Sequence, residues 1–188
     1  MGKFIIRILL FVIWAALNTS CMYYSMAGSI PAHINSIAIP IVENQTAEFG
    51  MSESVTENLL VKFNEENILR VTDEDQATSI LRGTITRVSD APYTFTKEEA
   101  VTEYRFTVHM KVEWYDVRDD KNLLEKSFSG WGAYGLSGDI SSDAIDNDGD
   151  GLIDGEDDDE FGDPREFATT VAVTKIAEDV LNEIMTSW

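Results

Sequence analysis

The sequence contains one cysteine, two histidines and four prolines, and only 14 lysine and arginine residues against 34 aspartate and glutamate residues. One cysteine excludes an internal disulfide, and His33 and His109 lie too far apart in sequence to form a paired catalytic or metal motif. A formal net charge of −20 disfavours nucleic acid as a partner. No Gly-rich phosphate loop, nucleophile elbow or zinc-ligand spacing is present, so we expect no enzyme.

The N-terminus has the pattern of a bacterial lipoprotein signal peptide over residues 1–20. Lys3 and Arg7 precede the apolar run Ile8–Leu17, which is too short to span the ~30 Å hydrocarbon core of a membrane. Small residues then lead to Cys21, whose thiol we expect to carry diacylglycerol, with a further acyl chain such as palmitate on the new N-terminus. A plain secretory signal or a short membrane anchor is the alternative. Several acyl chains would anchor the remaining domain persistently.

Residues 21–188 are expected to form one domain, and its first half alternates between strand and helix patterns. Ile37, Ile39 and Ile41 share one face of a strand expected over Ser36–Val42, in which Pro40 predicts an edge position or a bulge. A helix capped by Ser52 is expected next. Its apolar stripe faces the core and comprises Val55, Leu59, Leu60 and Phe63.

The second half predicts three more strands and a helix. A strand over Ile80–Val88 is expected to end at Asp90-Ala91-Pro92, and Tyr104–Trp114 alternates apolar and polar residues. A turn at Asp119–Asn122 leads to a strand over Leu123–Leu136, in which Gly130 and Gly132 predict a bulge or a close neighbour. Apolar residues from Val173 to Trp188 predict the second helix. The resulting fold class is α+β, in the order β-α-β-β-β-α, with two helices packed on one face of a four-stranded mixed β-sheet.

An acidic insertion is expected between the last strand and the C-terminal helix, over residues 139–163. Residues 139–160 contain eleven carboxylates and no lysine or arginine. Part of this run matches the twelve-residue calcium loop, with carboxylates at positions 1, 3, 5, 9 and 12 and glycine at position 6. We therefore expect a weak structural Ca²⁺ site, with a dissociation constant on the order of 10⁻⁴–10⁻³ M. A solvated acidic linker is the alternative. The expected ligands are Asp146, Asp148, Asp150, the Leu152 carbonyl, Asp154 and Asp157.

The order of several short strings resembles the lipopolysaccharide-assembly lipoproteins (LptE-like). These strings are the stretch from Cys21 to Gly50, Ile80–Ile85, Glu103–Arg105, Val112–Asp116 and Gly130-Trp131-Gly132. The resemblance implies an outer-membrane lipoprotein on the periplasmic side, anchored to the membrane by its lipid. It further implies that the lipoprotein helps to assemble and plug a large β-barrel, the lipopolysaccharide export translocon.

Two points stay open at this stage. Contact with lipopolysaccharide requires either bridging cations or a basic strip formed by Arg82, Arg105 and Lys111, whereas the simpler interpretation is a solvated sheet face. The alternative function is a calcium-dependent envelope or surface binding lipoprotein that shares only the fold. A β-barrel partner would favour the first function, and chelator-sensitive binding would favour the second.

Overall fold

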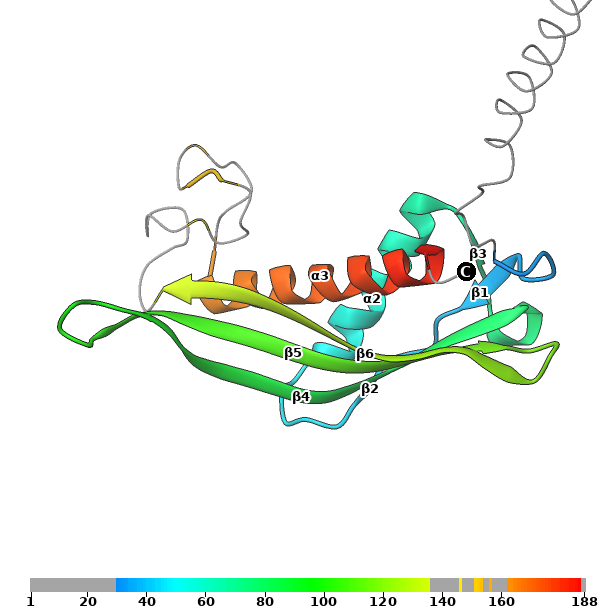
Figure 1. Ribbon diagram of the computed structural model, residues 1–188, viewed down its shortest axis with the longest axis horizontal. Coiled ribbons are helices and arrows are strands. Elements are labelled where there is room, and N and C mark those ends of the chain that lie inside the picture. The colour runs from blue at the N-terminus through cyan, green and yellow to red at the C-terminus, as the bar shows by residue number, and fades with distance from the viewer. Residues whose placement is uncertain (1–29, 136–145, 147–150, 154–155, 157–161, 187–188) are drawn as a thin grey trace, which may run out of the picture.

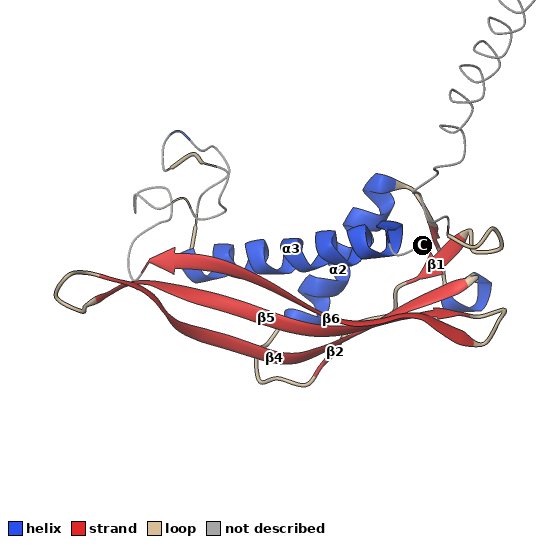
Figure 2. Ribbon diagram, viewed as in Figure 1, coloured by secondary structure: helices blue, strands red, loops and turns tan. Residues whose placement is uncertain are grey.

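The computed structural model describes residues 30–135, 146, 151–153, 156 and 162–186. Its strands pair in the order β3-β1-β4-β5-β6, and β2 pairs separately with β4. Both helices lie on one side of the sheet (Figures 1 and 2). The elements are β1 (Ser36–Ala38), β2 (Glu43–Asn44), α2 (Met51–Glu66), β3 (Arg70–Val71), the 3-10 helix η2 (Glu74–Gln76), β4 (Ser79–Phe95), β5 (Val101–Asp116), β6 (Lys121–Gly135) and α3 (Pro164–Thr186).

The predicted α+β class, the mixed sheet and the two helices on one face are confirmed, but the number of strands is wrong. β1, β2 and β3 run parallel to their neighbours, whereas β4, β5 and β6 pair antiparallel. The sheet has six strands instead of four. The single strand predicted over Ser36–Val42 is replaced by two short strands, β1 and β2, and the two-residue strand β3 adds a further one at the edge. Strands this short carry no alternation that a sequence pattern can reveal.

The break between β1 and β2 is the bulge that Pro40 predicts. Ala38 pairs with Ile80, and pairing resumes at Glu43 with Thr84. Five steps along one strand therefore face four steps along β4, which is the definition of a β-bulge. Proline has no N–H to donate at this point, so leaving the ladder here loses no hydrogen bond from its nitrogen.

Two predicted boundaries are wrong. The helix α2 has Gly50 at its N-cap, with φ of 75°, and no side chain caps it, so Ser52 lies inside the first turn. The strand β4 continues through Pro92 to Phe95. Beyond Ile85, the described part of β4 pairs only with β5. No described strand therefore pairs with its other edge over this stretch, where a proline without an N–H is tolerated.

The core lies between the sheet and the two helices. Alternate residues of β5, namely Phe106, Val108, Met110, Val112 and Trp114, are completely buried. This confirms the predicted one-sided strand. The stripe of α2 contributes Val55, Leu59 and Phe63 to the same core, against which Leu60 packs partly buried. Within the described residues, no helix is long and apolar enough to cross a membrane.

Helix α3 lies directly on the backbone of β6. A Cβ atom built on Gly130 would stand 1.9 Å from the carbonyl oxygen of Ala172, and one on Gly132 would stand 2.3 Å from that of Ala168. Only glycine permits this approach, as the sequence predicted for these two positions. The contact fixes the height of α3 above the sheet.

Candidate functional site

The candidate interaction surface is the side of β4, β5 and β6 that faces away from the helices, here called the open face. Its residues alternate with the buried ones, and on β5 they are half-buried polar side chains. Register places Thr107 and Lys111 of β5 opposite Ser89 and Thr84 of β4. The open face comprises Arg82, Thr84, Arg87 and Ser89 on β4, Arg105, Thr107, His109, Lys111 and Glu113 on β5, and Ser127, Ser129 and Trp131 on β6.

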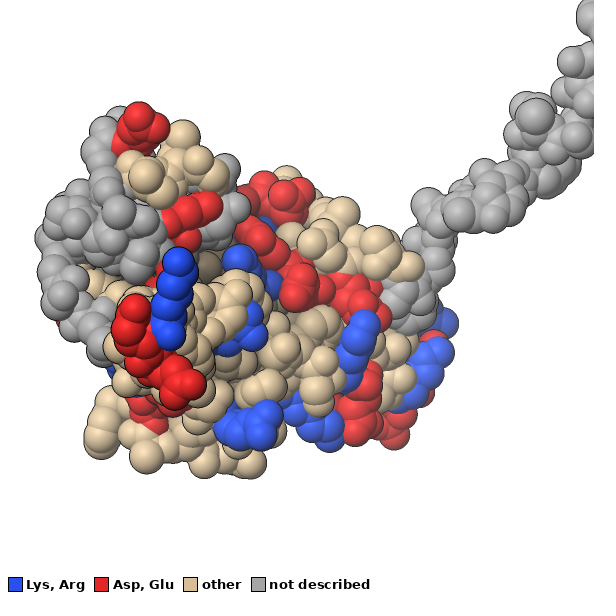
Figure 3. All heavy atoms as spheres, turned by 60° about the vertical axis from the view of Figure 1, so that its left-hand side comes forward, with Lys and Arg blue, Asp and Glu red and all other residues tan. Residues whose placement is uncertain are grey.

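The cations of the open face do not form the basic strip that the sequence left open. Arg105 and Lys111 are six residues apart on one strand, a separation of roughly 20 Å. Lys111 contacts Glu113 at 2.9 Å and Glu125 at 2.8 Å, and these bonds, the one to Glu125 first, raise its pKa. Lysine and arginine side chains are likewise interspersed with acidic ones on the side of the molecule shown in Figure 3. Lys111 is therefore paired with carboxylates, whereas Arg82, Arg87 and Arg105 make no ion pair with any described residue.

Arg105 is held by aromatic rings instead of carboxylates. Its guanidinium carbon lies 4.3 Å from the centre of the Tyr93 ring and 4.0 Å from that of the Trp131 ring. Its Nε atom is buried and has no hydrogen-bond partner in the described part of the chain. Lys175 of α3 approaches the same Trp131 ring at 5.1 Å. Cation–π contacts of this kind hold a guanidinium in place without neutralising it.

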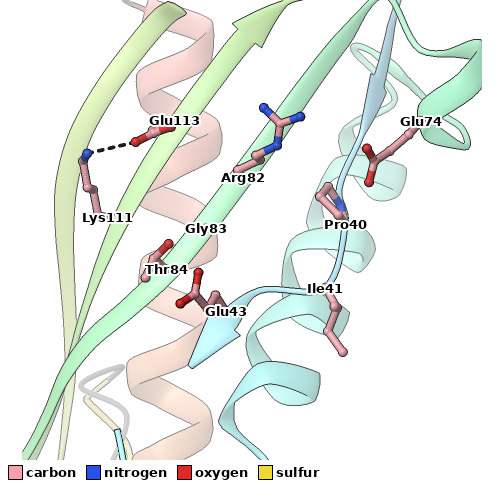
Figure 4. A pocket seen from close by; sticks show the side chains of 9 residues that line it. All are labelled: Pro40, Ile41, Glu43, Glu74, Arg82, Gly83, Thr84, Lys111 and Glu113. Carbon is pink, nitrogen blue, oxygen red and sulfur yellow. Dashed lines mark hydrogen bonds and ion pairs between the residues drawn. The ribbon is translucent and has the colours of Figure 1, made fainter. Parts of the chain in front are cut away.

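A hollow of about 400 Å³ lies beside the β1–β2 bulge. Pro40, Ile41 and Glu43 line it on one side, and Arg82, Gly83 and Thr84 of β4 line the other (Figure 4). Lys111, Glu113 and Glu74 complete the wall. Two cations and three carboxylates surround this space, but none of the nine residues is a histidine, cysteine or serine. The hollow suits a polar contact.

The two histidines have separate structural roles. His33 Nε2 lies 2.7 Å from Asp116 Oδ2, and the backbone N–H groups of Arg118 and Asp119 donate to Oδ1 of the same carboxylate. Asp116 is fully buried. Burial would raise the pKa of Asp116, but the hydrogen bonds from His33 and the two backbone groups hold it below its ordinary value. This contact fixes the first described loop to the end of β5.

A metal at this place would need His33, Asp116 and Asp119, whose nearest ligand atoms lie within 4.8 Å of one another. Both Asp116 oxygens already accept hydrogen bonds, so His33 and Asp116 have a structural role.

His109 lies on the open face, and its Nε2 lies 3.0 Å from Arg87. Burial first, and then the charge of Arg87, lowers the pKa of His109. His109 is therefore neutral near pH 7 and its Nε2 accepts the arginine N–H.

A second anchor, which sequence reasoning missed, lies at the start of α3. Arg165 bonds both carboxylate oxygens of Glu48, at 2.9 and 3.1 Å, and Asp90 at 2.9 Å. Tyr134 donates to the same Asp90 at 2.7 Å, and burial together with this bond raises the pKa of Tyr134 to about 12. Asp163 accepts the N–H groups at the start of the helix. The partners are up to 117 residues apart, so no local pattern reveals them.

Most of the site residues named from the sequence fall outside the described part of the chain. Cys21, Asp148, Asp150, Asp154 and Asp157 are among them. Asp146 and Leu152 are described. Asp146 Oδ2 accepts the backbone N–H of Gly151 at 3.1 Å, and Gly151 has φ of 96°.

Comparison with known proteins identifies the family. The family model described as Lipopolysaccharide-assembly (LptE) matches residues 34–186. The chain belongs to the LptE family. This match bears out the resemblance, including the outer-membrane lipoprotein character, at the level of the family. No curated protein matched the chain.

Solved structures share the fold at low identity. A protein from Xanthomonas campestris superposes with a TM-score of 0.52 at 8% identity, covering 83% of this chain and 88% of that one. A hypothetical protein from Chlamydia trachomatis gives 0.50 at 8% identity, with coverage of 81% and 96%. Uncharacterized lipoprotein B from Nitrosomonas europaea gives 0.50 at 6% identity, with coverage of 85% and 90%. These similarities extend the fold of this LptE-family chain to other bacterial proteins.

Proposed function

We propose that this LptE-family chain is the outer-membrane lipoprotein component of a lipopolysaccharide export translocon, where it helps to assemble and plug a large β-barrel partner. The observation that carries the proposal is the family match over residues 34–186, which includes every described strand and both helices. This LptE family is a non-enzymatic lipopolysaccharide-assembly family. We therefore prefer this function to a calcium-dependent binding lipoprotein that shares only the fold.

The open face is the surface that we assign to the barrel wall. Three long antiparallel strands present a broad surface whose polar side chains are partly accessible and whose Lys111 charge is already paired. Such a surface can meet the polar lumen of a barrel, where polar partners would offset the desolvation of its side chains. Because Arg82, Arg105 and Lys111 form no continuous strip, we assign protein contact to this face ahead of direct contact with lipopolysaccharide.

The tether fits the same arrangement. We propose that Cys21 carries the lipid, twelve residues before His33. An extended segment of that length reaches at most roughly 40 Å. The bond between His33 and Asp116 fixes its end at the turn between β5 and β6. That end of the domain is therefore the one kept near the membrane.

Site-directed photo-crosslinking in the native host tests the barrel contact. A photoreactive residue at Ser89 or Thr107 is expected to crosslink to a large envelope β-barrel, because both side chains lie on the open face. Glu57, which is exposed on α2, provides the control on the opposite side of the molecule and is expected to crosslink less. If neither open-face position captures a β-barrel, the plug role is wrong.

Removal of the lipid site tests the anchorage. Cys21→Ala is expected to abolish partition of the mature protein into detergent, because no described helix offers a membrane span. Met22→Ala, next to the same position, is the matched control and keeps the thiol. Unchanged detergent partition of the mature form of Cys21→Ala would contradict the lipid anchor, whereas an uncleaved precursor still carries the apolar run Ile8–Leu17.

We further propose that the loop from Asp146 to Asp157 binds one structural Ca²⁺ weakly. The hydrogen bond from Gly151 to Asp146 joins positions 6 and 1 of the loop, and the positive φ of Gly151 meets the requirement for a sharp turn at position 6. Position 12 is Asp157, whose shorter side chain reaches less far than the usual glutamate. The Leu152 carbonyl at position 7 would supply a backbone ligand.

Calorimetry with millimolar CaCl₂ on the full chain tests the calcium proposal. Binding heat and a modest rise in melting temperature are expected, since a ligand that binds only the folded state stabilises it by mass action. Asp148→Ala combined with Asp150→Ala is expected to remove both effects without unfolding the domain. Asp73→Ala with Asp75→Ala, at exposed positions near η2, is the charge-matched control. No heat and no shift in the parent protein would leave the solvated acidic linker.

A further inference from the structure

The free edge of β6 borders a groove that the proposed function does not use. Among the described strands, β6 pairs only with β5 and forms a 15-residue edge of the sheet. A groove of about 360 Å³ runs between this edge and the C-terminal half of α3. It is lined by residues 126–129 of β6 and by Asp179, Asn182, Glu183 and Thr186 of α3.

The lining residues show that the groove exposes strand backbone. Side chains of successive strand residues point to opposite faces. Lys126 and Phe128 lie on the helix side, whereas Ser127 and Ser129 pair with open-face residues. A groove bordered by all four must follow the edge itself, where backbone N–H and C=O groups are available. The helix residues recur at intervals of three and four and therefore form one face of α3.

The groove follows from the packing of α3. At Gly130 and Gly132 the helix backbone touches the strand backbone. Farther along, the larger side chains of Phe128 and Lys126 replace the glycines, and α3 and β6 diverge (Figure 1). Lys126 bonds Glu183 across this wider part at 2.7 Å. A strand edge beside a helix face is the arrangement that accepts an added peptide strand.

We infer that this groove, the β6–α3 groove, binds an extended peptide segment of a partner protein by strand addition, with a basic side chain of the peptide opposite Asp179. Main-chain hydrogen bonds to β6 would supply the affinity, and the helix face would supply selectivity. Glu183 is already paired with Lys126, whereas Asp179 is exposed and makes no ion pair within the described residues. The groove therefore keeps one uncompensated negative charge.

The net negative charge of the chain favours a basic peptide over a second copy of the chain as the occupant of the groove. Two copies joined edge to edge through β6 would bring together two chains of net charge −20 and two Asp179 side chains. Such repulsion opposes association, whereas a basic peptide is attracted. The inference does not depend on lipopolysaccharide or on the barrel contact of the open face, so failure of either proposal leaves the other standing.

Selection from a phage-displayed library of random dodecapeptides on the full chain tests the inference. Enriched sequences are expected to contain lysine or arginine among β-branched residues. The best peptide, made synthetically, is expected to shift the backbone amide NMR signals of residues 126–129 and 179–186 and to slow hydrogen exchange along the β6 edge. A version methylated on alternate backbone nitrogens is expected to bind at least tenfold more weakly, because it cannot complete the ladder.

A charge reversal sharpens the test. Asp179→Lys is expected to weaken the peptide about three- to tenfold, whereas Glu57→Lys, an exposed reversal on α2, is expected to have no effect. The inference is overturned if no peptide is enriched, if binding maps elsewhere, or if the methylated peptide binds equally well. It is also overturned if the chain self-associates with its β6 edge protected in the absence of peptide.

Discussion

The two faces of the β4–β6 sheet are made from alternate residues of the same strands, yet they obey different requirements. On the helix side, Phe106, Val108 and Met110 are fully buried, and glycines admit α3 to backbone contact. On the open face, the intervening Thr107, His109 and Lys111 stay half-buried, and His109 and Lys111 have polar partners on neighbouring strands. The helix side therefore depends on close packing, and the open face on polar and cation–π contacts between strands. Substitutions on the first should affect folding, and substitutions on the second should affect association.

The largest difference between the faces is expected at Phe106, which is fully buried and lies beneath the guanidinium of Arg165 at 4.8 Å. Phe106→Ala should lower the free energy of unfolding by about 3–5 kcal/mol, because it removes buried apolar surface and leaves a cavity. Thr107→Ala, its neighbour on the open face, should change it by less than about 0.5 kcal/mol. Urea denaturation followed by circular dichroism measures both, and equal losses would remove the distinction between the faces.

Gly130 and Ser129 form the second matched pair. Gly130→Ala places a Cβ against the Ala172 carbonyl, so α3 must move, at a cost of about 1–3 kcal/mol or more in unfolding free energy. Ser129→Ala, one residue earlier and on the opposite face, should be nearly neutral. Thermal denaturation is the measurement. A tolerated Gly130→Ala would mean that the helix is less closely seated than its backbone contact indicates.

The buried Asp116 extends the comparison to pH. Its lowered pKa means that its contribution to stability is complete above its ordinary value of 3.8 and is lost as the pH falls through the lower folded-state value. Asp116→Asn should cost about 1–3 kcal/mol at pH 7, because buried hydrogen bonds lose an acceptor. It should also flatten the dependence of stability on pH below about 4. Asp75→Asn, at an exposed position, is the control and should change neither quantity.

An effect on folding smaller than those of Phe106→Ala, Gly130→Ala and Asp116→Asn is expected at Arg105. Arg105→Ala removes two cation–π contacts on the open face and should cost about 1 kcal/mol. Arg105→Lys keeps the charge but not the flat guanidinium, and should recover only part of the loss. Urea denaturation at two salt concentrations measures the effect. A loss as large as that of Phe106→Ala would show that the open face also carries the fold.

The sequence allowed the long, regular elements to be predicted and left the long-range contacts hidden. Strict alternation from Tyr104 to Trp114 revealed β5, and Pro40 revealed the bulge, because both signals are local. The extension of β4 through Pro92 was missed, since it depends on an edge left free by the shortness of β2. Ser52 was predicted as the N-cap of α2, but the N-cap is Gly50. A glycine in the left-handed conformation can begin this helix without a side-chain hydrogen bond.

The candidate site was also predicted only in part, because its strand alternation is a local signal whereas its contacts are long-range. The alternation placed Arg82, Arg105 and Lys111 on one face correctly, but it carried no information on what each would contact. The carboxylates and rings that hold them come from other strands. The Arg165 anchor joins three separate segments and was not predicted. Side-chain partners from distant segments can be identified only when the strand register and the packing of the elements are known.

Gly130-Trp131-Gly132 serves both sides of the sheet within three residues. Its glycines admit the backbone of α3, while the indole between them faces the other way and stacks with Arg105. Neither glycine can gain a side chain without moving a helix, and shortening the tryptophan removes one of the two rings that hold Arg105. A protein engineer who reuses this scaffold must therefore transplant the tripeptide as one unit together with Ala168, Ala172 and Arg105. At this point of the sheet, its two surfaces have to be designed together.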